Sequence, residues 1–175
     1  YDFLLLAFSQ LVHTAAYWRH MTGGRLTCPV VIRTYVARKS GEAAQHTGSW
    51  QSLFGHIPGL KTVMPATAYD AKGLTLSAIR DGDPVLILEH RNLNEDKGHV
   101  PESLYYVPIG KARIAREGKD VTIVAVSAAI HDVLGILKTL TEKNISAEVI
   151  DLVSIRPIDK ETIVSSVRKT RRLIV

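Results

Sequence analysis

Short, continuously apolar stretches alternate with amphipathic ones along most of this 175-residue chain, and that alternation restricts the fold more than any other feature. Runs rich in β-branched residues predict five strands, at residues 29–33, 61–64, 84–88, 121–126 and 147–152. Apolar residues that recur every three or four positions predict helices at residues 3–21, 68–80, 129–143 and 160–169. Because the strands are apolar on both faces, we expect an α/β fold with parallel sheets covered by helices.

Residues that commonly begin helices stand before three of the predicted helices. They are Thr67 with Asp70, Ser127, and Asp159 with Glu161. A side-chain oxygen at such a position accepts a hydrogen bond from the backbone of the first turn. We therefore expect helices to begin directly after Thr67, Ser127 and Asp159.

A polar segment with two prolines divides the chain into two α/β units. Residues 90–98 are mostly polar or charged, and Pro101 and Pro108 interrupt any regular element there. We predict a first domain at residues 1–89, a linker at 90–118 and a second domain at 119–175. The chain starts within a predicted helix, without methionine, and residues 172–175 look like an unfinished strand, so we expect both domains to be partial.

Composition narrows the class of protein. Hydrophobic residues make up 46% of the chain and charged residues 22%, which is typical of a folded globular protein and excludes collagen-like and disordered chains. No run approaches 18 uninterrupted apolar residues and no secretory signal is visible, so we expect no membrane partner. The net charge of +5 raises the question of nucleic acid, but aromatic residues do not alternate with the basic ones, and we expect no nucleic-acid partner.

The single cysteine and the missing phosphate motifs limit the chemistry. Cys28 precedes a proline at a strand start, and we interpret it as a buried structural thiol in an intracellular protein. The chain contains neither GxGxxG nor GxxxxGK[ST], and it lacks Gly-Asp-Gly followed by a distant asparagine. No nucleotide or metal–diphosphate site is therefore predicted from its motifs.

Two short segments hold the candidate site residues. His46 lies in a loop after a predicted strand, where parallel sheets place their ligands; the alternative is that it only caps a helix near Ser49. Asp81 and Asp83 could bind a metal, but two carboxylates before a strand are more often turn formers. Both alternatives stay open at this level.

Longer motifs resemble the beta subunit of the 2-oxo-acid dehydrogenases, a transketolase-like family that includes the pyruvate, branched-chain and acetoin enzymes. The first domain is similar to the family's pyrimidine-binding domain in residues 43–46, 57–61, 64–65, 69–74, 78–81 and 84–85. The second is similar to its transketolase C-terminal domain in residues 108–112, 116–124, 147–152, 155–159 and 169–173. The motifs occur in the family's order and cover nearly the whole chain.

The resemblance implies oxidative decarboxylation of a 2-oxo acid by thiamine diphosphate, with acyl transfer to lipoyl groups. An alpha subunit would supply the diphosphate and magnesium site, which fits the missing phosphate motif. The implied assembly is an α2β2 heterotetramer, with beta subunits paired, bound to a lipoyl-bearing acyltransferase core. Its location would be the cytoplasm of a prokaryote or the mitochondrial matrix of a eukaryote.

The family's functional positions can be carried over to this chain. Phe3 matches the aromatic contact to the cofactor's aminopyrimidine, and His46 matches the active-site histidine beside the substrate and lipoyl entrance. The family also has a structural potassium ion, held largely by backbone carbonyls. Its positions fall on Val30, Ala78, Ile79, Asp81 and Asp83.

The chain also departs from the family pattern. The family's cofactor-activating glutamate lies before the position of Tyr1, so we expect this fragment alone to be inactive. Residues 35–40, Tyr-Val-Ala-Arg-Lys-Ser, stand where a glycine-rich stretch is usual before the Gln-His pair. A truncated, inactive transketolase-like domain that binds a partner or self-associates is therefore the main alternative. A transketolase or deoxyxylulose-phosphate synthase fragment is a further one, against which residues 78–81 and 109–112 argue.

Overall fold

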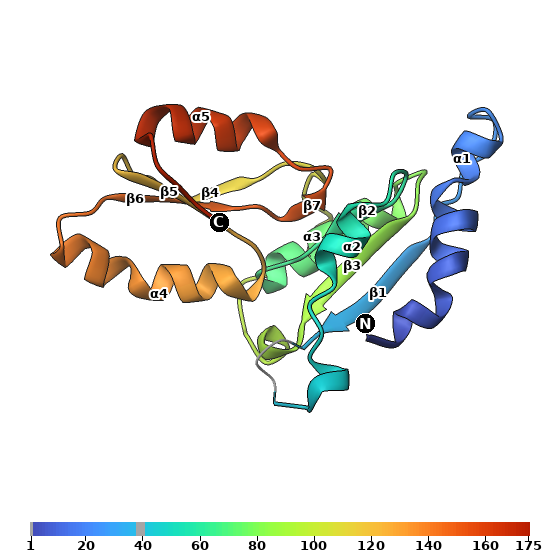
Figure 1. The fold of residues 1–175 in the computed structure, drawn as a ribbon, viewed down its shortest axis with the longest axis horizontal. Coiled ribbons are helices and arrows are strands. Elements are labelled where there is room, and N and C mark those ends of the chain that lie inside the picture. Colours follow the sequence, from blue (N-terminus) through green and yellow to red (C-terminus); the bar gives the residue numbers. More distant parts are fainter. Residues whose placement is uncertain (1, 38–40) are drawn as a thin grey trace.

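In the computed structural model, which describes residues 2–37 and 41–175, the chain forms two four-stranded sheets, each covered by helices (Figure 1). The strand order is β1-β3-β2-β7 in the first sheet and β4-β6-β5-β8 in the second. The expected α/β fold is confirmed. Both sheets are mixed rather than purely parallel, because one edge strand of each, β7 and β4, runs antiparallel to its neighbour.

The fourth strand of the first sheet comes from a later part of the chain, after the strands β4, β5 and β6 of the second sheet. Three parallel strands, β1 (Val31–Val36), β2 (Lys61–Val63) and β3 (Val85–His90), form its body. Strand β7 (Ser154–Arg156) follows the second sheet's β6 in the chain and returns to pair with β2, with Ser154 opposite Val63. The two halves are therefore interlocked.

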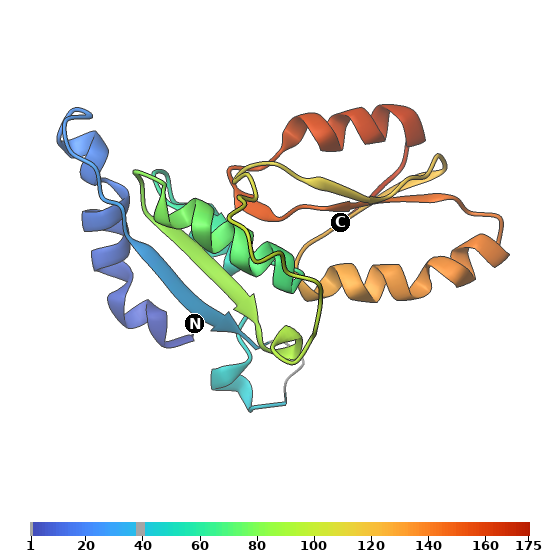
Figure 2. The same cartoon turned by 180° about the vertical axis from the view of Figure 1, so that it is seen from behind.

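Side chains of β3 alternate between two hydrophobic clusters, one on each face of the first sheet. Leu86 and Leu88 pack with the N-terminal helical segment and with α2 (Gln51–Gly55). Val85 and Ile87 pack with α3 (Ala68–Ile79) on the opposite face, where Figure 2 shows this helix in front of the strands. All four side chains are fully buried, as the apolar strand pattern predicts.

The N-terminal segment is helical, but the prediction of one helix over residues 3–21 is wrong. It consists of a 3-10 helix, η1 (Asp2–Ala7), a π-helix, η2 (Gln10–Ala16), and a short α-helix, α1 (Trp18–Met21). Hydrogen bonds from i to i+5 in a π-helix bring Leu11 and Ala16 to one side. Both of these side chains are buried against the first sheet.

The second sheet lies between two helices. Strands β5 (Val121–Ala125), β6 (Ala147–Asp151) and β8 (Leu173–Ile174) are parallel, so the strand suspected at the end of the chain is confirmed. Helix α4 (Ala128–Glu142) covers one face and α5 (Lys160–Thr170) the other, as Figure 1 shows.

The segment predicted as a linker carries regular structure. Strand β4 (Arg113–Arg116) lies within it and pairs with β6, so the second unit's sheet begins before residue 119. Farther upstream, Tyr105 stacks on Tyr69 with 4.2 Å between ring centroids, and Ser77 donates a hydrogen bond of 2.7 Å to the carbonyl of Val107. Residues 101–107 thus form a strap along α3.

All three predicted helix starts are confirmed, because α3, α4 and α5 begin directly after Thr67, Ser127 and Asp159. Thr67 and Asp159 accept hydrogen bonds from the backbone N–H groups of Asp70 and Thr162. Ser127 occupies the N-cap position of α4, but its side chain makes no capping bond, because its hydroxyl donates instead to the carbonyl of Pro65 in the first unit. Cys28 is half-buried rather than buried.

No helix among the described residues has both the length and the apolar character needed to cross a membrane. No group of three or more histidine, cysteine or acidic side chains in residues 2–37 and 41–175 is arranged to hold a metal ion.

Candidate functional site

Phe3 and His46, which are 43 positions apart in the sequence, lie in contact. Their ring centroids are 5.4 Å apart at an interplanar angle of 60°, an edge-to-face arrangement. Phe3 comes from η1, and His46 ends a 3-10 turn, η3 (Ala44–His46), that follows β1. The two aromatic candidates from the sequence therefore share one place.

The contact lies at the surface. The side chain of Phe3 is 64% exposed, and His46 is partly exposed beside it. His46 does not cap α2, because the N-cap of that helix is Trp50. Its loop follows the carboxyl end of β1, the edge at which parallel sheets commonly bind ligands.

The residues just before this loop differ from expectation. Tyr35 and Val36, the first two residues of the stretch that departs from the family's glycine-rich pattern, belong to β1. Residues 38–40 of that stretch lie outside the described residues. The altered stretch therefore begins within a regular strand, whose last residue, Val36, is buried.

A cavity of about 470 Å³ lies between the two units. The first unit contributes Val36, Met64 and His90, from the carboxyl ends of its three parallel strands, together with Ser49. The second contributes residues at the start of α4, among them His131, whose Nε2 lies 2.7 Å from the carbonyl oxygen of Ala66. Its volume is typical of small-molecule pockets, and pockets often lie between domains.

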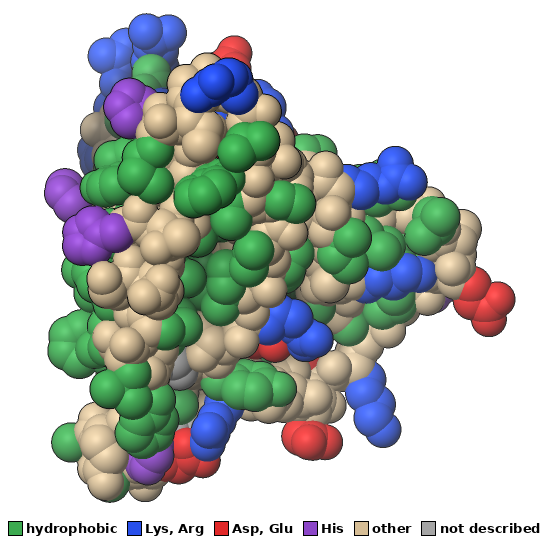
Figure 3. All heavy atoms as spheres, turned by 90° about the vertical axis from the view of Figure 1, so that its right-hand side faces the viewer, with side chains coloured by type: hydrophobic (Ala, Val, Ile, Leu, Met, Phe, Trp, Pro, Cys, Tyr) green, Lys and Arg blue, Asp and Glu red, His purple; other side chains and the backbone are tan. Residues whose placement is uncertain are grey.

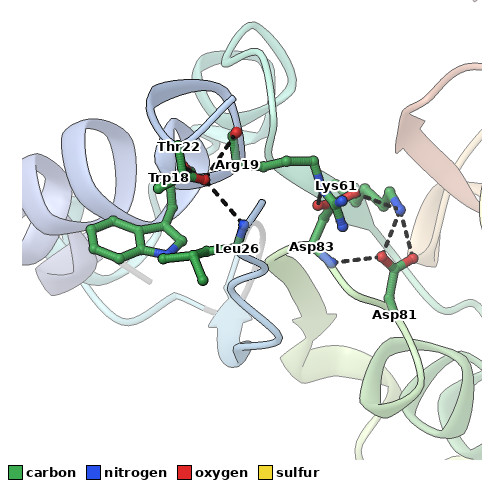
Figure 4. Close-up of polar contacts among 7 residues, drawn as sticks. All are labelled: Trp18, Arg19, Thr22, Leu26, Lys61, Asp81 and Asp83. Atoms are coloured by element: carbon green, nitrogen blue, oxygen red, sulfur yellow. Dashed lines mark hydrogen bonds and ion pairs between the residues drawn. The ribbon is translucent and has the colours of Figure 1, made fainter. Parts of the chain in front are cut away.

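Asp81 and Asp83 lie in a turn that two cations neutralise (Figure 4). The Nζ of Lys61 lies 2.6 and 2.7 Å from the carboxylate oxygens of Asp81 and 3.5 Å from Asp83. Arg19 of α1 forms an ion pair with Asp83. Burial acts to raise the pKa of Asp83, but the bonds from Arg19 and Lys61 outweigh it and hold the pKa below its ordinary value.

The other positions expected around a potassium ion are close to this turn but contribute backbone only. The carbonyl of Val30 accepts a hydrogen bond of 3.0 Å from Val85, and that of Ala78 accepts one of 3.1 Å from Asp81. The side chain of Ile79 is 61% exposed. The carboxylates are already paired, so any cation here would depend on carbonyl oxygens.

Sequence reasoning missed a charged cluster between the units. Arg113 of β4 donates to Asp70 at 2.9 and 3.0 Å and to Asp151 at 2.6 Å, and both carboxylates are fully buried. Burial raises the pKa of Asp151; Arg113 opposes the rise and the charge of Asp70 adds to it. No motif marks these residues, because they are distant in sequence and one lies in a strand with an exposed pattern.

Comparisons with known proteins agree with this architecture. Residues 1–96 match the family "Transketolase, pyrimidine binding domain", and residues 110–175 match "Transketolase, C-terminal domain". The chain is 47% identical over 174 residues to the acetoin:2,6-dichlorophenolindophenol oxidoreductase subunit beta of Cupriavidus necator, covering 99% of this chain and 52% of that protein. It is 43% identical over 175 residues to the pyruvate dehydrogenase E1 component subunit beta of Rickettsia felis, covering 100% and 54%.

A solved structure shows the same fold. The "Split gene transketolase, inactive beta4 tetramer" superposes with a TM-score of 0.81 at 26% identity, covering 98% of this chain and 53% of that one. The chain thus spans about half the length of the curated relatives it matches. Related subunits come from bacteria and from plant mitochondria.

Proposed function

This chain belongs to the transketolase family, in which it comprises a pyrimidine-binding domain and a C-terminal domain, and we propose that it is part of a 2-oxo-acid dehydrogenase beta subunit. The whole protein would carry out oxidative decarboxylation of a 2-oxo acid and pass the acyl group to lipoyl arms. The observation that carries the proposal is the contact between Phe3 and His46. The family resemblance assigns Phe3 and His46 to one site, and these two residues from distant segments are in contact in the fold.

The surroundings of Phe3 fit a shared thiamine diphosphate site. The cofactor, when bound, supplies the electron sink for decarboxylation. Because Phe3 is 64% exposed, part of its ring is free to pack against the flat aminopyrimidine. The chain lacks the Gly-Asp-Gly diphosphate motif, so an alpha subunit would supply the diphosphate and magnesium site.

His46 would handle protons beside the substrate. Its imidazole is partly exposed and lies against Phe3, so a ring nitrogen can give or accept a proton there. Activation of the cofactor would depend on the glutamate that the resemblance places before Tyr1. We therefore assign turnover to the full-length protein with its alpha partner.

We infer the partners and the cellular location of the whole protein from those of related subunits. The assembly would be an α2β2 heterotetramer, with a beta–beta contact, that docks on a lipoyl-bearing acyltransferase core. It would work in the cytoplasm of a prokaryote or in the mitochondrial matrix of a eukaryote. Bacterial and plant mitochondrial relatives support this proposal.

A structural potassium ion would be held by the backbone carbonyls of residues 30, 78, 79, 81 and 83. Carbonyl oxygens suit a weakly hydrated cation, and the turn at Asp81 is joined to the carbonyl of Ala78 by a backbone hydrogen bond. Lys61 and Arg19 already neutralise the carboxylates, which supports a carbonyl cage rather than a carboxylate site.

A second candidate is an inactive module that binds a partner or its own copies. Exposed apolar side chains on the N-terminal face favour it, including Phe3, Leu6 and Met21, and Figure 3 shows hydrophobic side chains spread over this side. The structural relative described as an inactive beta4 tetramer also points this way. An alpha subunit would cover the same surface.

Reconstitution separates the two functions. The full-length beta subunit is mixed with its alpha partner, and decarboxylation or cleavage is followed with pyruvate, 3-methyl-2-oxobutanoate and acetoin. We expect turnover of at least one, and a His46→Gln variant slower by about 10² or more. His99→Gln, at an exposed position before the strap, should keep full activity. No turnover with any substrate despite complex formation would favour the binding module.

A further inference from the structure

The loop that carries His46 is tied to the N-terminal segment by one carboxylate. Oδ1 of Asp2 accepts a hydrogen bond of 3.1 Å from the backbone N–H of Gly48 and one of 3.3 Å from Nε1 of Trp50. Asp2 immediately precedes Phe3, and Gly48 lies two residues after His46. The bonds therefore join the two short segments that carry the candidate site residues.

Gly48 has no room for a side chain at this junction. A Cβ there would lie 2.2 Å from Oδ1 of Asp2 and 2.2 Å from Nε1 of Trp50. These distances are far shorter than a van der Waals contact, so the carboxylate and the indole close over the backbone only because residue 48 is glycine. The junction thus combines an acceptor, a ring donor and a glycine from two distant segments.

Among the described residues the loop has few other contacts that hold its position, chiefly an ion pair between Glu42 and Arg91 at the surface. The turn η3 has no buried residue. The hydroxyl of Thr47 donates a hydrogen bond of 2.8 Å to the carbonyl of Ala43, which lies within the same loop. Ala43 adopts a φ of +62°, which is unfavourable for a residue with a side chain. Polar contacts to Asp2 therefore contribute strongly to where His46 lies.

We propose that Asp2 is a positioning residue that holds His46 against Phe3. Its carboxylate pulls the 46–50 loop onto η1, which sets the edge-to-face contact between the two rings. The inference rests on the proposed function for its catalytic meaning, because the roles of Phe3 and His46 come from there. We call the two hydrogen bonds from Gly48 and Trp50 to Asp2 the clamp. Its effect on the position of His46 can be tested without cofactor.

The test is proton NMR of the His46 imidazole in this chain. His46→Gln assigns the signal among the seven histidines, and Phe3→Leu measures how far the Phe3 ring current shifts it. We expect Asp2→Ala to abolish that ring-current shift to the extent that Phe3→Leu does. Asp2→Asn should retain it, because an amide oxygen can still accept both hydrogen bonds. Signals from the second unit report whether each variant stays folded.

An unchanged His46 signal in folded Asp2→Ala would overturn the clamp, as would equal losses in Asp2→Ala and Asp2→Asn. If Asp2→Ala does not fold, Trp50→Phe, which removes only the indole donor, gives the same test with a partial loss expected. Turnover of the full complex distinguishes the two proposals. A lost ring contact with full activity would support the clamp and count against the catalytic role of His46.

Discussion

Arg113 and Asp70 form a two-point ion pair between the second sheet and the first unit, with Nη1–Oδ1 and Nη2–Oδ2 distances of 2.9 and 3.0 Å. Asp70 lies in the first turn of α3, where Thr67 also donates to it at 2.6 Å. The same guanidinium reaches Asp151 at the end of β6. One arginine thus compensates two fully buried carboxylates and joins the two halves.

Removing Arg113 should destabilise the chain by leaving both carboxylates buried without a partner. Loss of a buried pair's partner typically costs about 3–5 kcal/mol, and we expect about 2 kcal/mol because the Arg113 side chain is 43% exposed. Urea unfolding of Arg113→Met measures this change. Arg113→Lys should recover only part of it, since lysine cannot make the two-point contact. A change within experimental error would show that the cluster does not join the halves.

Stability should depend on pH through Asp151. Its pKa is raised in the folded chain, so the folded state binds the proton more tightly than the unfolded state. The resulting stabilisation is present at low pH and is lost as pH rises through the raised pKa. Asp151→Asn cannot ionise, so relative to the unaltered chain it should gain stability as pH rises above the ordinary pKa of aspartate, about 4. Parallel stability curves for the two proteins above that pH would contradict the assignment.

Two helical glycines should respond oppositely to alanine. A Cβ at Gly73 of α3 would lie 2.5 Å from Cγ2 of Val107 and 2.8 Å from the ring of Tyr105, so Gly73→Ala should push the strap away and destabilise the chain. Gly135 of α4 has nothing within 4 Å of that position. Gly135→Ala should therefore stabilise by about 0.5–1 kcal/mol through helix propensity. Thermal or urea unfolding compares them, and equal effects would rule out a packed strap.

Most of the strands that sequence reasoning identified are buried on both faces, whereas β1 is partly exposed and was found from its β-branched residues. Val85, Leu86, Ile87 and Leu88 are all fully buried, so the whole run is apolar and visible in the sequence. Strand β4 is exposed along its length and contains two arginines, and β7 has only three residues, so neither gives an apolar run. Their pairing is set by tertiary contacts that no local pattern encodes.

The site was predictable only where a motif existed. His46 follows a strand and resembles a family motif, and Phe3 was assigned by that resemblance alone. Asp2, Gly48 and Trp50 belong to no recognised motif, and nothing in the sequence relates position 2 to positions 48 and 50, although the fold joins them by hydrogen bonds. Ser127 looked like a helix cap because of its position, but the nearby carbonyl of Pro65 takes its hydroxyl.

A potassium ion held by carbonyls should stabilise the folded chain. At a concentration ten times its dissociation constant, such an ion adds about 1.4 kcal/mol. Unfolding is compared in potassium and choline chloride at equal ionic strength. Asp83→Asn should keep the potassium effect, because its carboxylate is paired with Arg19 rather than needed as a ligand. Equal stability in the two salts, or a loss of the effect in Asp83→Asn, would exclude a carbonyl cage.

Thiamine diphosphate binding tests the central claim most directly. Calorimetry with magnesium is carried out on the full-length beta subunit, on its alpha partner and on their complex. The shared site predicts saturable binding only in the complex, and binding at least ten-fold weaker when Phe3→Ala is present in the beta subunit. If either subunit alone bound the cofactor as tightly as the complex does, a shared site would be contradicted. If Phe3→Ala left the affinity of the complex unchanged, a cofactor site that includes Phe3 would be contradicted.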